Sequence, residues 1–534
     1  MESPLRKPHP SPTRKAYVET YGCQMNVSDG ELMQGILGAG GFELVRTPEE
    51  ADVILVNTCA IREHAEQRVL GRVGQLNARK LERPDVVIGV TGCMAQRMGE
   101  TLLEQAPYVD LVLGPDAYRA LPAAVARVRP EWGLAGEGVA GGEAAGAGAG
   151  AEPSSTRPGR RTLPVLGATD AGSLAGQGEG KAAAPSGRLG TRLRPELAAA
   201  TASVSLMGRR GERLALLDLQ PHEDYENLEV RRSEGVSAWV PVQRGCDHRC
   251  TYCIVPYVRG AEKNREPERI LAEVRSIARS GVPEVVLLGQ TVNSYRHGAW
   301  DFPALLRAVA RVEGIRRVRF TSPHPADVTP ELVAVMAEEP AVCAQLHLPA
   351  QAGHDRTLKR MLRRYTVEEF LEKVALVRAA VPGIALSTDI IVAFPGETEA
   401  EYEATLDLMR GVRFDDAYLY RYSPRDGTPA TRLPADSFVP AEVGQARLER
   451  LIGLQREIQA EINRAEVGRL EEVLVERPAR SEGDMLGRTE RNKMVVFPGG
   501  AELAGRFVRV RLTGTTGATF LGQRVEGDAA TRVA

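Results

Sequence analysis

The chain has 534 residues, long enough for about three or four domains, and 43% of them are hydrophobic, as is usual for proteins with a buried core. Its 68 Lys and Arg against 70 Asp and Glu give a formal net charge of −2, which excludes a uniformly basic nucleic-acid coat but allows a local basic patch. The polar N-terminus lacks a secretory apolar core, and no apolar run is long enough to cross a membrane. We therefore expect a cytoplasmic protein whose seven cysteines are reduced thiols.

The first part of the chain alternates apolar runs with helical patterns. After a tail at residues 1–15 that we expect to be disordered, strands are predicted at 16–23, 51–60 and 86–93, with a helical stretch after each. This alternation is the βαβ pattern of a parallel sheet, and the continuous apolar character of 51–60 indicates a strand covered on both faces. We therefore predict an α/β domain over residues 16–132.

Residues 133–221 are rich in Gly and Ala, most clearly in the stretch 136–155. Too few large apolar side chains are present there to offset the entropic cost of ordering the chain, so we predict a low-complexity linker. Near its end, residues 214–220 have the pattern of a short strand that rejoins the fold.

The central part, residues 222–466, repeats strands and amphipathic helices and ends in a long polar helix over 441–466. Six βα units in series predict a (βα)6 partial barrel, in which the C-terminal strand ends carry the chemistry. The expected strands are 238–243, 284–290, 317–322, 344–349, 384–392 and 417–423. The last segment, residues 467–534, consists of short alternating runs separated by glycines, which predicts a small antiparallel β-barrel.

Three cysteines follow the first strand of the predicted barrel in the pattern CxxxCxxC. Cys246, Cys250 and Cys253, the barrel triad, are close enough in sequence to bind one metal centre from a single loop. Three thiolates leave one iron of a [4Fe–4S] cube free to bind another group, whereas tetrahedral zinc takes a fourth ligand. We interpret the loop as a three-cysteine iron–sulfur site. The alternatives are a zinc site completed by His248 and a set of unligated thiols.

A second set of cysteines, Cys23, Cys59 and Cys93, is spaced about 35 residues apart, and each stands at the end of a predicted parallel strand. Because successive βα units return the chain to the same sheet edge, these thiols, the N-terminal triad, should meet in the crevice where open α/β sheets bind ligands. The spacing predicts a second three-cysteine cluster, and the alternative is three small buried side chains. The remaining cysteine, Cys343, is interpreted as a core thiol.

A CxxxCxxC after the first strand of a βα barrel resembles the radical S-adenosylmethionine superfamily. Within it, residues 16–130 and 222–525 resemble the methylthiotransferases. The stretches that carry this resemblance are YGCQMNVSDGE (21–31), VNTCAIREHAE (56–66), TGCMAQR (91–97), VQRGCDHRCTYCIVPYVRG (242–260), LLGQTVNSY (287–295), LHLPAQAG (346–353) and STDIIVAFPGETE (387–399). The YGCQMN opening and the CTYCIVPY run favour the branch that modifies N6-isopentenyladenosine in tRNA.

This resemblance implies radical methylthiolation at C2 of N6-isopentenyladenosine at tRNA position 37, next to the anticodon, which gives 2-methylthio-N6-isopentenyladenosine. It implies that the barrel triad holds the [4Fe–4S] cluster that cleaves S-adenosyl-L-methionine to a 5′-deoxyadenosyl radical. It also implies that the N-terminal triad holds an auxiliary [4Fe–4S] cluster that delivers sulfur, and that a second S-adenosyl-L-methionine supplies the methyl group. The implied partners are the tRNA anticodon stem-loop, an electron donor such as flavodoxin or ferredoxin, and a sulfur source. We expect a monomer with no membrane partner.

Further site residues follow from the barrel topology and the resemblance. Gln290 and Asn293 come after the second barrel strand and Asp389 lies in the fifth, where contacts to S-adenosylmethionine are expected; ordinary loop hydrogen bonds are the alternative. The last segment resembles a TRAM domain, a small RNA-binding barrel, whose positive charge should contact the tRNA backbone. A solvated arginine-rich strand is the alternative there. The residues expected to bind RNA are Arg488, Arg491, Lys493, Arg509 and Arg511.

Two other functions remain open at this point. One is a methylthiotransferase that acts on threonylcarbamoyl-adenosine in tRNA or on an aspartate of a ribosomal protein. The other is a zinc-stabilised RNA-binding module without catalysis. The chain also departs from the family's usual Val and two Ser at Ala350, Ala352 and His354, so cofactor contacts made by those serines are not expected here.

Overall fold

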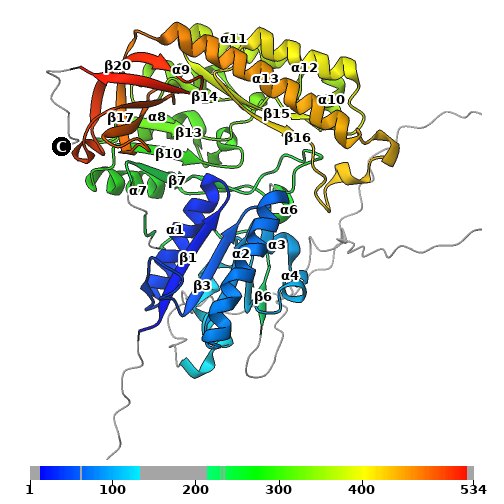
Figure 1. Ribbon diagram of the computed structural model, residues 1–534, viewed down its shortest axis with the longest axis vertical. Helices are drawn as coiled ribbons and strands as arrows, with labels where there is room; N and C mark the ends of the chain where they lie inside the picture. The colour runs from blue at the N-terminus through cyan, green and yellow to red at the C-terminus, as the bar shows by residue number, and fades with distance from the viewer. Residues whose placement is uncertain (1–12, 61–62, 133–212, 229, 233–234, 526–534) are drawn as a thin grey trace, which may run out of the picture. The chain divides into compact units, whose positions relative to one another are not determined.

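The computed structural model describes residues 13–60, 63–132, 213–228, 230–232 and 235–525. These residues form a parallel α/β domain, a partial barrel of βα units and a small β-barrel, in the chain order that the sequence predicts (Figure 1). Apart from residues 13–15, the predicted tail lies outside the described residues, as does the predicted linker up to residue 212. Among the described residues, no helix has both the length and the apolar character that a membrane span requires.

The sheet of the N-terminal domain has six parallel strands in the order β2-β1-β3-β4-β5-β6. Its central strands are buried along their whole length, as their continuous apolar sequence predicts. The strands are β1 (Lys15–Tyr21), β2 (Glu43–Leu44), β3 (Val53–Thr58), β4 (Val87–Gly92), β5 (Leu111–Leu113) and β6 (Leu214–Leu216).

Helices cover both faces of this sheet and give it two apolar cores. On one face α1 and α5 pack against Val53 and Leu55, and on the other α2 packs against Ile54 and Val56. Neighbouring residues of β3 thus alternate between the two cores, as the twofold periodicity of a strand requires. The helices are α1 (Gln24–Ala39), α2 (Glu63–Glu82), α3 (Cys93–Met98), α4 (Thr101–Gln105) and α5 (Leu121–Val128).

Strand β6 identifies the domain that the chain rejoins after the Gly- and Ala-rich segment. Leu214 pairs with Leu111, and Leu216 pairs with Leu113, in parallel register at the edge of the N-terminal sheet. Residues 133–212 therefore connect two elements of one domain. The N-terminal domain therefore continues beyond residue 132, which was its expected end, and includes β6.

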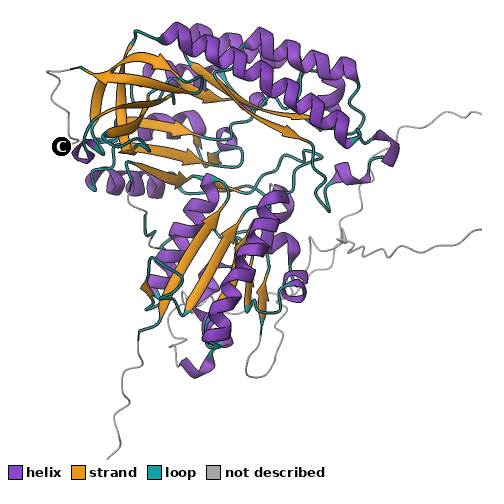
Figure 2. Ribbon diagram, viewed as in Figure 1, coloured by secondary structure: helices purple, strands orange, loops and turns teal. Residues whose placement is uncertain are grey.

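The central domain contains all six predicted strands. They lie in two three-stranded parallel sheets, β7-β10-β13 and β14-β15-β16, linked by a bridge between Val318 and Val342. Helices cover the outside of these sheets, as Figure 2 shows, and a single apolar core fills the space between the two layers. The strands are β7 (Ser237–Pro241), β10 (Glu284–Leu288), β13 (Arg317–Phe320), β14 (Gln345–His347), β15 (Ala385–Val392) and β16 (Asp416–Arg421).

The helices of this domain follow the strands in alternation, and α13 agrees with the long polar helix expected at 441–466. They are α6 (Val255–Val258), α7 (Pro267–Arg279), α8 (Phe302–Ala310), α9 (Pro330–Glu338), α10 (Asp355–Arg360), α11 (Val367–Ala380), α12 (Glu399–Val412) and α13 (Ala441–Glu466). Two small hairpins lie between them, β8 (Gln243–Arg244) with β9 (Lys263–Asn264) and β11 (Arg296–His297) with β12 (Trp300–Asp301).

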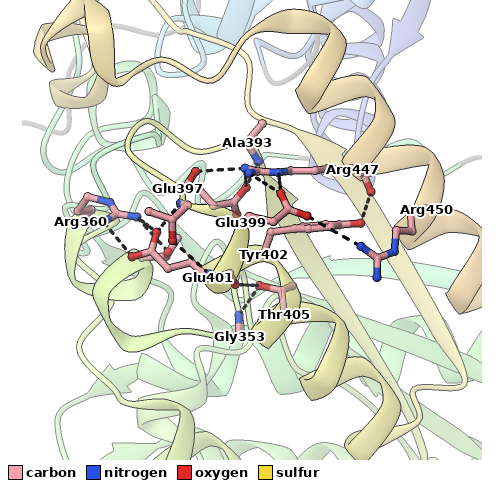
Figure 3. A network of polar contacts seen from close by, with 12 residues as sticks. Gly353, Arg360, Ala393, Glu397, Glu399, Glu401, Tyr402, Thr405, Arg447 and Arg450 are labelled. Atoms are coloured by element: carbon pink, nitrogen blue, oxygen red, sulfur yellow. Dashed lines mark hydrogen bonds and ion pairs between the residues drawn. The ribbon is translucent and has the colours of Figure 1, made fainter.

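A polar network fixes the turn between β15 and α12 (Figure 3). Thr398 and Glu401 form a capping box at the start of α12, and Glu401 also pairs with Arg360 at 2.8 Å. One residue before this cap, the Glu397 carboxylate accepts a hydrogen bond from Arg447 of α13 at 2.9 Å. Three segments of the domain are thereby joined around one turn.

Five strands close the C-terminal barrel in the order β17-β18-β19-β21-β20. Neighbouring strands are antiparallel except β19 and β21, which run parallel. An odd number of strands cannot alternate in direction around a closed ring, so one parallel pair is unavoidable in the predicted barrel. The strands are β17 (Leu470–Pro478), β18 (Asp484–Thr489), β19 (Met494–Pro498), β20 (Phe507–Thr515) and β21 (Thr519–Arg524).

Two buried arginines of β13 bind main-chain carbonyls of the C-terminal barrel. Arg317 donates to the carbonyl oxygens of Arg488 and Glu472, and Arg319 donates to those of Thr489 and Glu490, at 2.7–2.8 Å. Arg319 is also paired with Glu284 at 3.0 Å, so its charge is balanced inside the protein.

Candidate metal centre

The N-terminal triad stands at the carboxyl ends of three neighbouring strands. In the register of the sheet, Tyr21 pairs with Thr58 and Thr58 with Gly92, and Cys59 and Cys93 are the next residues along their strands. Cys23 follows Tyr21 by two residues and is the N-cap of α1. The parallel sheet therefore brings the three cysteines to one edge, and their role as cluster ligands stays a prediction.

Glycines precede two of these cysteines at positions where a side chain would not fit. Gly22 and Gly92 have φ angles of +144° and +93°, which L side chains rarely adopt. A Cβ atom on Gly92 would lie 2.5 Å from the carbonyl oxygen of Thr58, and one on Gly22 would lie 2.9 Å from the Cβ of Cys59. The absence of these side chains lets the three strand ends approach one another.

Cys93 is one of the two buried cysteines of this triad. Burial raises its pKa to about 11, a shift that the guanidinium of Arg259 opposes and that the nearby Cys23 increases. Arg259 donates from Nε to the Sγ of Cys93 at 3.1 Å. Cys23 has a different partner, since its Sγ lies 3.2 Å from the Oδ1 of Asn26.

The barrel triad occupies the loop between β8 and α6. Cys246 lies 3.2 Å from the Oγ1 of Thr291, and the amide of Cys253 donates to the carbonyl oxygen of Cys250 at 3.0 Å. Burial, followed by the nearby Cys250 and Cys246, raises the pKa of Cys253 to about 12. The three thiols are therefore near enough to influence one another electrostatically.

Both triads suit a cluster with one iron left free. The structure describes all seven cysteines of the chain, and none of them is in a disulfide. Metal-binding cysteines act as thiolates. Burial disfavours a thiolate that has no positive partner, so a bound metal cluster would stabilise these thiolates. Three thiols on a single loop or sheet edge match the donor set of a three-cysteine [4Fe–4S] site.

The alternative zinc ligand, His248, has other partners in the structure. Its ring stacks on that of His324 with 4.1 Å between centroids and 11° between planes, and its Nε2 lies 3.5 Å from a carboxylate oxygen of Asp327. Potential ligand atoms of these three residues lie within 4.8 Å of one another. However, nearly parallel rings do not aim their nitrogen lone pairs at one ion, and Nδ1 of His324 already accepts from the amide of Ala326.

The residues expected to contact S-adenosylmethionine have different surroundings. The Oε1 of Gln290 is buried without a hydrogen-bond partner, so it is available to a ligand. The side-chain amide of Asn293 instead binds the backbone of His324, at 2.9 Å as donor and 2.7 Å as acceptor. Asp389 is part-exposed on β15 and lies 3.4 Å from Nε2 of His347.

Three of the five residues expected to bind RNA have anionic partners within the protein. Arg488 pairs with Glu476, Arg491 with Glu466 and Glu471, and Lys493 with Asp415, at 2.6–2.7 Å. Arg509 and Arg511 are exposed alternate residues of β20 and therefore share one face of the C-terminal barrel, and Arg511 donates to the carbonyl oxygen of Gly468.

A basic pocket of about 380 Å³ opens beside the barrel triad. Arg363 links the two, because it lines the pocket and donates from Nη1 to the Sγ of Cys250 at 3.5 Å. The charged side chains that line it are Arg249, Lys359, Arg363, Arg364, Asp355 and Glu369.

The side chains that surround the cysteines were not predicted from the sequence. Thr291 and Arg363 contact the barrel triad, and Arg259 contacts the N-terminal triad. Arg244 and Arg259 both pair with Asp29 of α1. The one available signal was position in the sequence, since Arg244 and Arg259 flank the CxxxCxxC loop and Asp29 lies in the helix that Cys23 caps.

Three family descriptions match consecutive parts of the chain. Residues 15–114 match "Uncharacterized protein family UPF0004", residues 240–409 match "Radical SAM superfamily", and residues 464–524 match "TRAM domain". The N-terminal triad lies entirely within the first matched region, and the barrel triad lies entirely within the second.

Full-length relatives share one name, "tRNA-2-methylthio-N(6)-dimethylallyladenosine synthase". The protein of that name from Moorella thermoacetica is 40% identical, over 96% of this chain and 99% of the relative. That from Chlorobium limicola is 37% identical, over 97% and 99%. Among solved structures, the radical S-adenosylmethionine methyltransferase TsrM from Kitasatospora setae matches at 14% identity and a TM-score of 0.48, over 86% of this chain and 77% of that one.

Proposed function

The chain belongs to the tRNA-2-methylthio-N(6)-dimethylallyladenosine synthase family, and we propose that it methylthiolates C2 of N6-isopentenyladenosine at position 37 of tRNA by radical chemistry. The product is 2-methylthio-N6-isopentenyladenosine. Relatives of 37–40% identity that match almost end to end support this substrate and reaction.

The observation that carries the proposal is the presence of two cysteine triads, one in each of the first two domains, each with two buried thiols and one part-exposed thiol. The C2–H of adenine is neither acidic nor electrophilic, so acid–base groups alone do not activate it. Two [4Fe–4S] clusters and S-adenosyl-L-methionine, when bound, would supply the radical and the methylthio group. We assign the radical cluster to Cys246, Cys250 and Cys253, and the auxiliary cluster to Cys23, Cys59 and Cys93.

The chain's own residues position these groups and exclude water from them. Thr291 and Arg363 hold Cys246 and Cys250 in place, and Gln290 offers an unpartnered oxygen for S-adenosylmethionine. We assign Asp389 to the same ligand, because it is part-exposed on the fifth barrel strand. Asn293 would act indirectly by holding the loop after β13.

We propose that the C-terminal barrel binds the backbone of the tRNA anticodon stem-loop. Arg509 and Arg511 support this assignment, because they are exposed on one face of β20. Arg488, Arg491 and Lys493 would have to exchange internal ion pairs for phosphate contacts. Since the substrate is tRNA, we place the enzyme in the cytoplasm as a monomer, served by a flavodoxin- or ferredoxin-like electron donor and a sulfur source.

The test separates the two triads. After anaerobic reconstitution, the wild-type chain should hold about eight irons. In C250A we expect loss of 5′-deoxyadenosine formation, because the radical cluster loses a ligand. In C59A we expect 5′-deoxyadenosine formation to continue while methylthiolated nucleoside, measured by mass spectrometry of digested tRNA, disappears.

The matched control is C343A, which removes a buried thiol outside both triads and should preserve both activities. Continued cleavage in C250A, or methylthiolated product from C59A, would contradict the assignment of the corresponding triad. A wild-type chain that carries two zinc ions and no iron would contradict the proposed function as a whole.

A further inference from the structure

A buried group of charges connects the two cysteine-bearing domains. Asp29 of α1 accepts hydrogen bonds from Nη1 of Arg244 at 2.6 Å and from Nη2 of Arg259 at 2.7 Å. The residues are 0%, 5% and 4% exposed, respectively. Asp29 belongs to the helix that Cys23 caps, and the two arginines flank the loop of the barrel triad. A single carboxylate therefore ties the loops of both triads together.

The charges of this group do not cancel without a further anion. Arginine stays protonated in proteins, so two guanidinium groups and one carboxylate leave one positive charge in a buried region. Burying an uncompensated charge is costly. A second buried ion pair in the same region, Lys263 with Asp116 at 2.6 Å, contains one charge of each sign and so does not change the net charge. The ring of Tyr225, 4.9 Å from the Cζ of Arg244, offers only its π face.

Arg259 also contacts a cysteine of the N-terminal triad. Its Nε–H donates to the Sγ of Cys93 at 3.1 Å, while its Nη2 donates to Asp29. One buried guanidinium therefore joins Asp29 to a proposed ligand of the auxiliary cluster.

We propose that Arg259 is a positioning residue that reaches from the radical-cluster loop to the auxiliary cluster, and that its hydrogen bond to Cys93 raises the reduction potential of that cluster. Hydrogen bonds to ligating sulfurs and local positive charge both favour the reduced, more negative state of an iron–sulfur cluster. Asp29, which Arg244 also holds, keeps the guanidinium in the orientation that this bond requires. The inference rests on the proposed function, because it takes the N-terminal triad as cluster ligands.

The test is a redox titration of the reconstituted full-length chain, followed by electron paramagnetic resonance. The signal that changes on addition of S-adenosylmethionine belongs to the radical cluster, and the unchanged signal to the auxiliary cluster. In R259M the auxiliary midpoint potential should shift to more negative values, because the charge and the hydrogen bond are both lost. In R259K it should fall between R259M and wild type, because lysine keeps the charge but cannot reproduce the two separate guanidinium contacts.

The matched control is E284Q, which weakens an equally buried ion pair with Arg319 in the barrel, 3.0 Å apart and without contact to any triad. It should lower thermal stability and leave both potentials unchanged. An auxiliary potential in R259M equal to that of wild type would overturn the proposal. If R259M assembles no auxiliary cluster, the test rests on R259K. An auxiliary midpoint potential in R259K equal to that of wild type would then overturn the proposal. A wild-type chain that binds only one cluster would refute the proposed function, an outcome separate from these.

Discussion

Glu397 is a carboxyl group whose pKa is raised more by burial than it is lowered by the ion pair with Arg447 (Figure 3). Burial raises its pKa from 4.5 to about 7, although Arg447 and the amide of Ala393 donate to it. Between these two pH values the folded protein keeps a proton that the unfolded chain has already lost. The free energy of unfolding should therefore fall as the pH rises through this window.

We expect E397Q to abolish that fall, because glutamine does not titrate. The measurement is urea unfolding of both proteins at about pH 5 and about pH 8, where wild type should lose up to about 3 kcal/mol more than E397Q. An equal loss in the two proteins would show that Glu397 is ionised throughout.

At the scale of single residues, the positions of the N-terminal cysteines could be predicted from the sequence, whereas the side chains that contact them could not. Strand phase and the βα period were enough to bring Cys23, Cys59 and Cys93 to one sheet edge, because both are regular along the sequence. The pairing of Asp29 with Arg259 spans 230 residues and depends on how two domains meet. No local pattern encodes such a contact.

Among the elements, the turn that opens the CxxxCxxC loop depends on a single glycine. Gly245 has a φ angle of +77°, and a Cβ there would lie 1.9 Å from the carbonyl oxygen of Ala261, two residues before β9. We expect G245A to cost about 1–3 kcal/mol of stability and to displace Cys246. Iron analysis should show loss of about four irons, with loss of S-adenosylmethionine cleavage.

The control for this turn is G281A. Gly281 has a similar φ of +81°, but a Cβ there meets no atom within 4 Å. It should cost about 1 kcal/mol and keep its full iron content. Full iron and normal cleavage in G245A would mean that the loop tolerates a rearranged hairpin.

The elements also show where sequence patterns were insufficient. All six barrel strands were predicted, because each is an apolar run between amphipathic helices. Strands β2 and β5 have two and three residues, too few to establish a period of two, whereas the equally short β6 was expected within 214–220. Strand β18 has little strand pattern in its sequence: it contains Asp484, Gly487 and Arg488, and a Cβ on its glycine would lie 2.4 Å from Val473.

For the whole molecule, the position of β6 changes the interpretation of the Gly- and Ala-rich segment. Residues 133–212 leave and re-enter the same sheet, because β5 and β6 are neighbours, with Leu111 paired to Leu214. The segment is therefore an insertion within one domain, and its length does not set the distance between the two triads. Loop closure costs change slowly with length, so a shorter connection should be tolerated.

We expect replacement of residues 136–210 by about twelve Gly and Ser residues to leave turnover within a few-fold of wild type. Iron content and the melting temperature should also be retained, because Trp132 and Leu214 remain anchored in the N-terminal core. The matched control removes residues 136–216 and so deletes β6. This variant should lose stability and auxiliary-cluster iron, because β5, the neighbour of the triad-bearing strand β4, then becomes an exposed edge strand. Complete loss of methylthiolation in the first variant, with both clusters present, would instead assign the insertion a direct role in handling the tRNA.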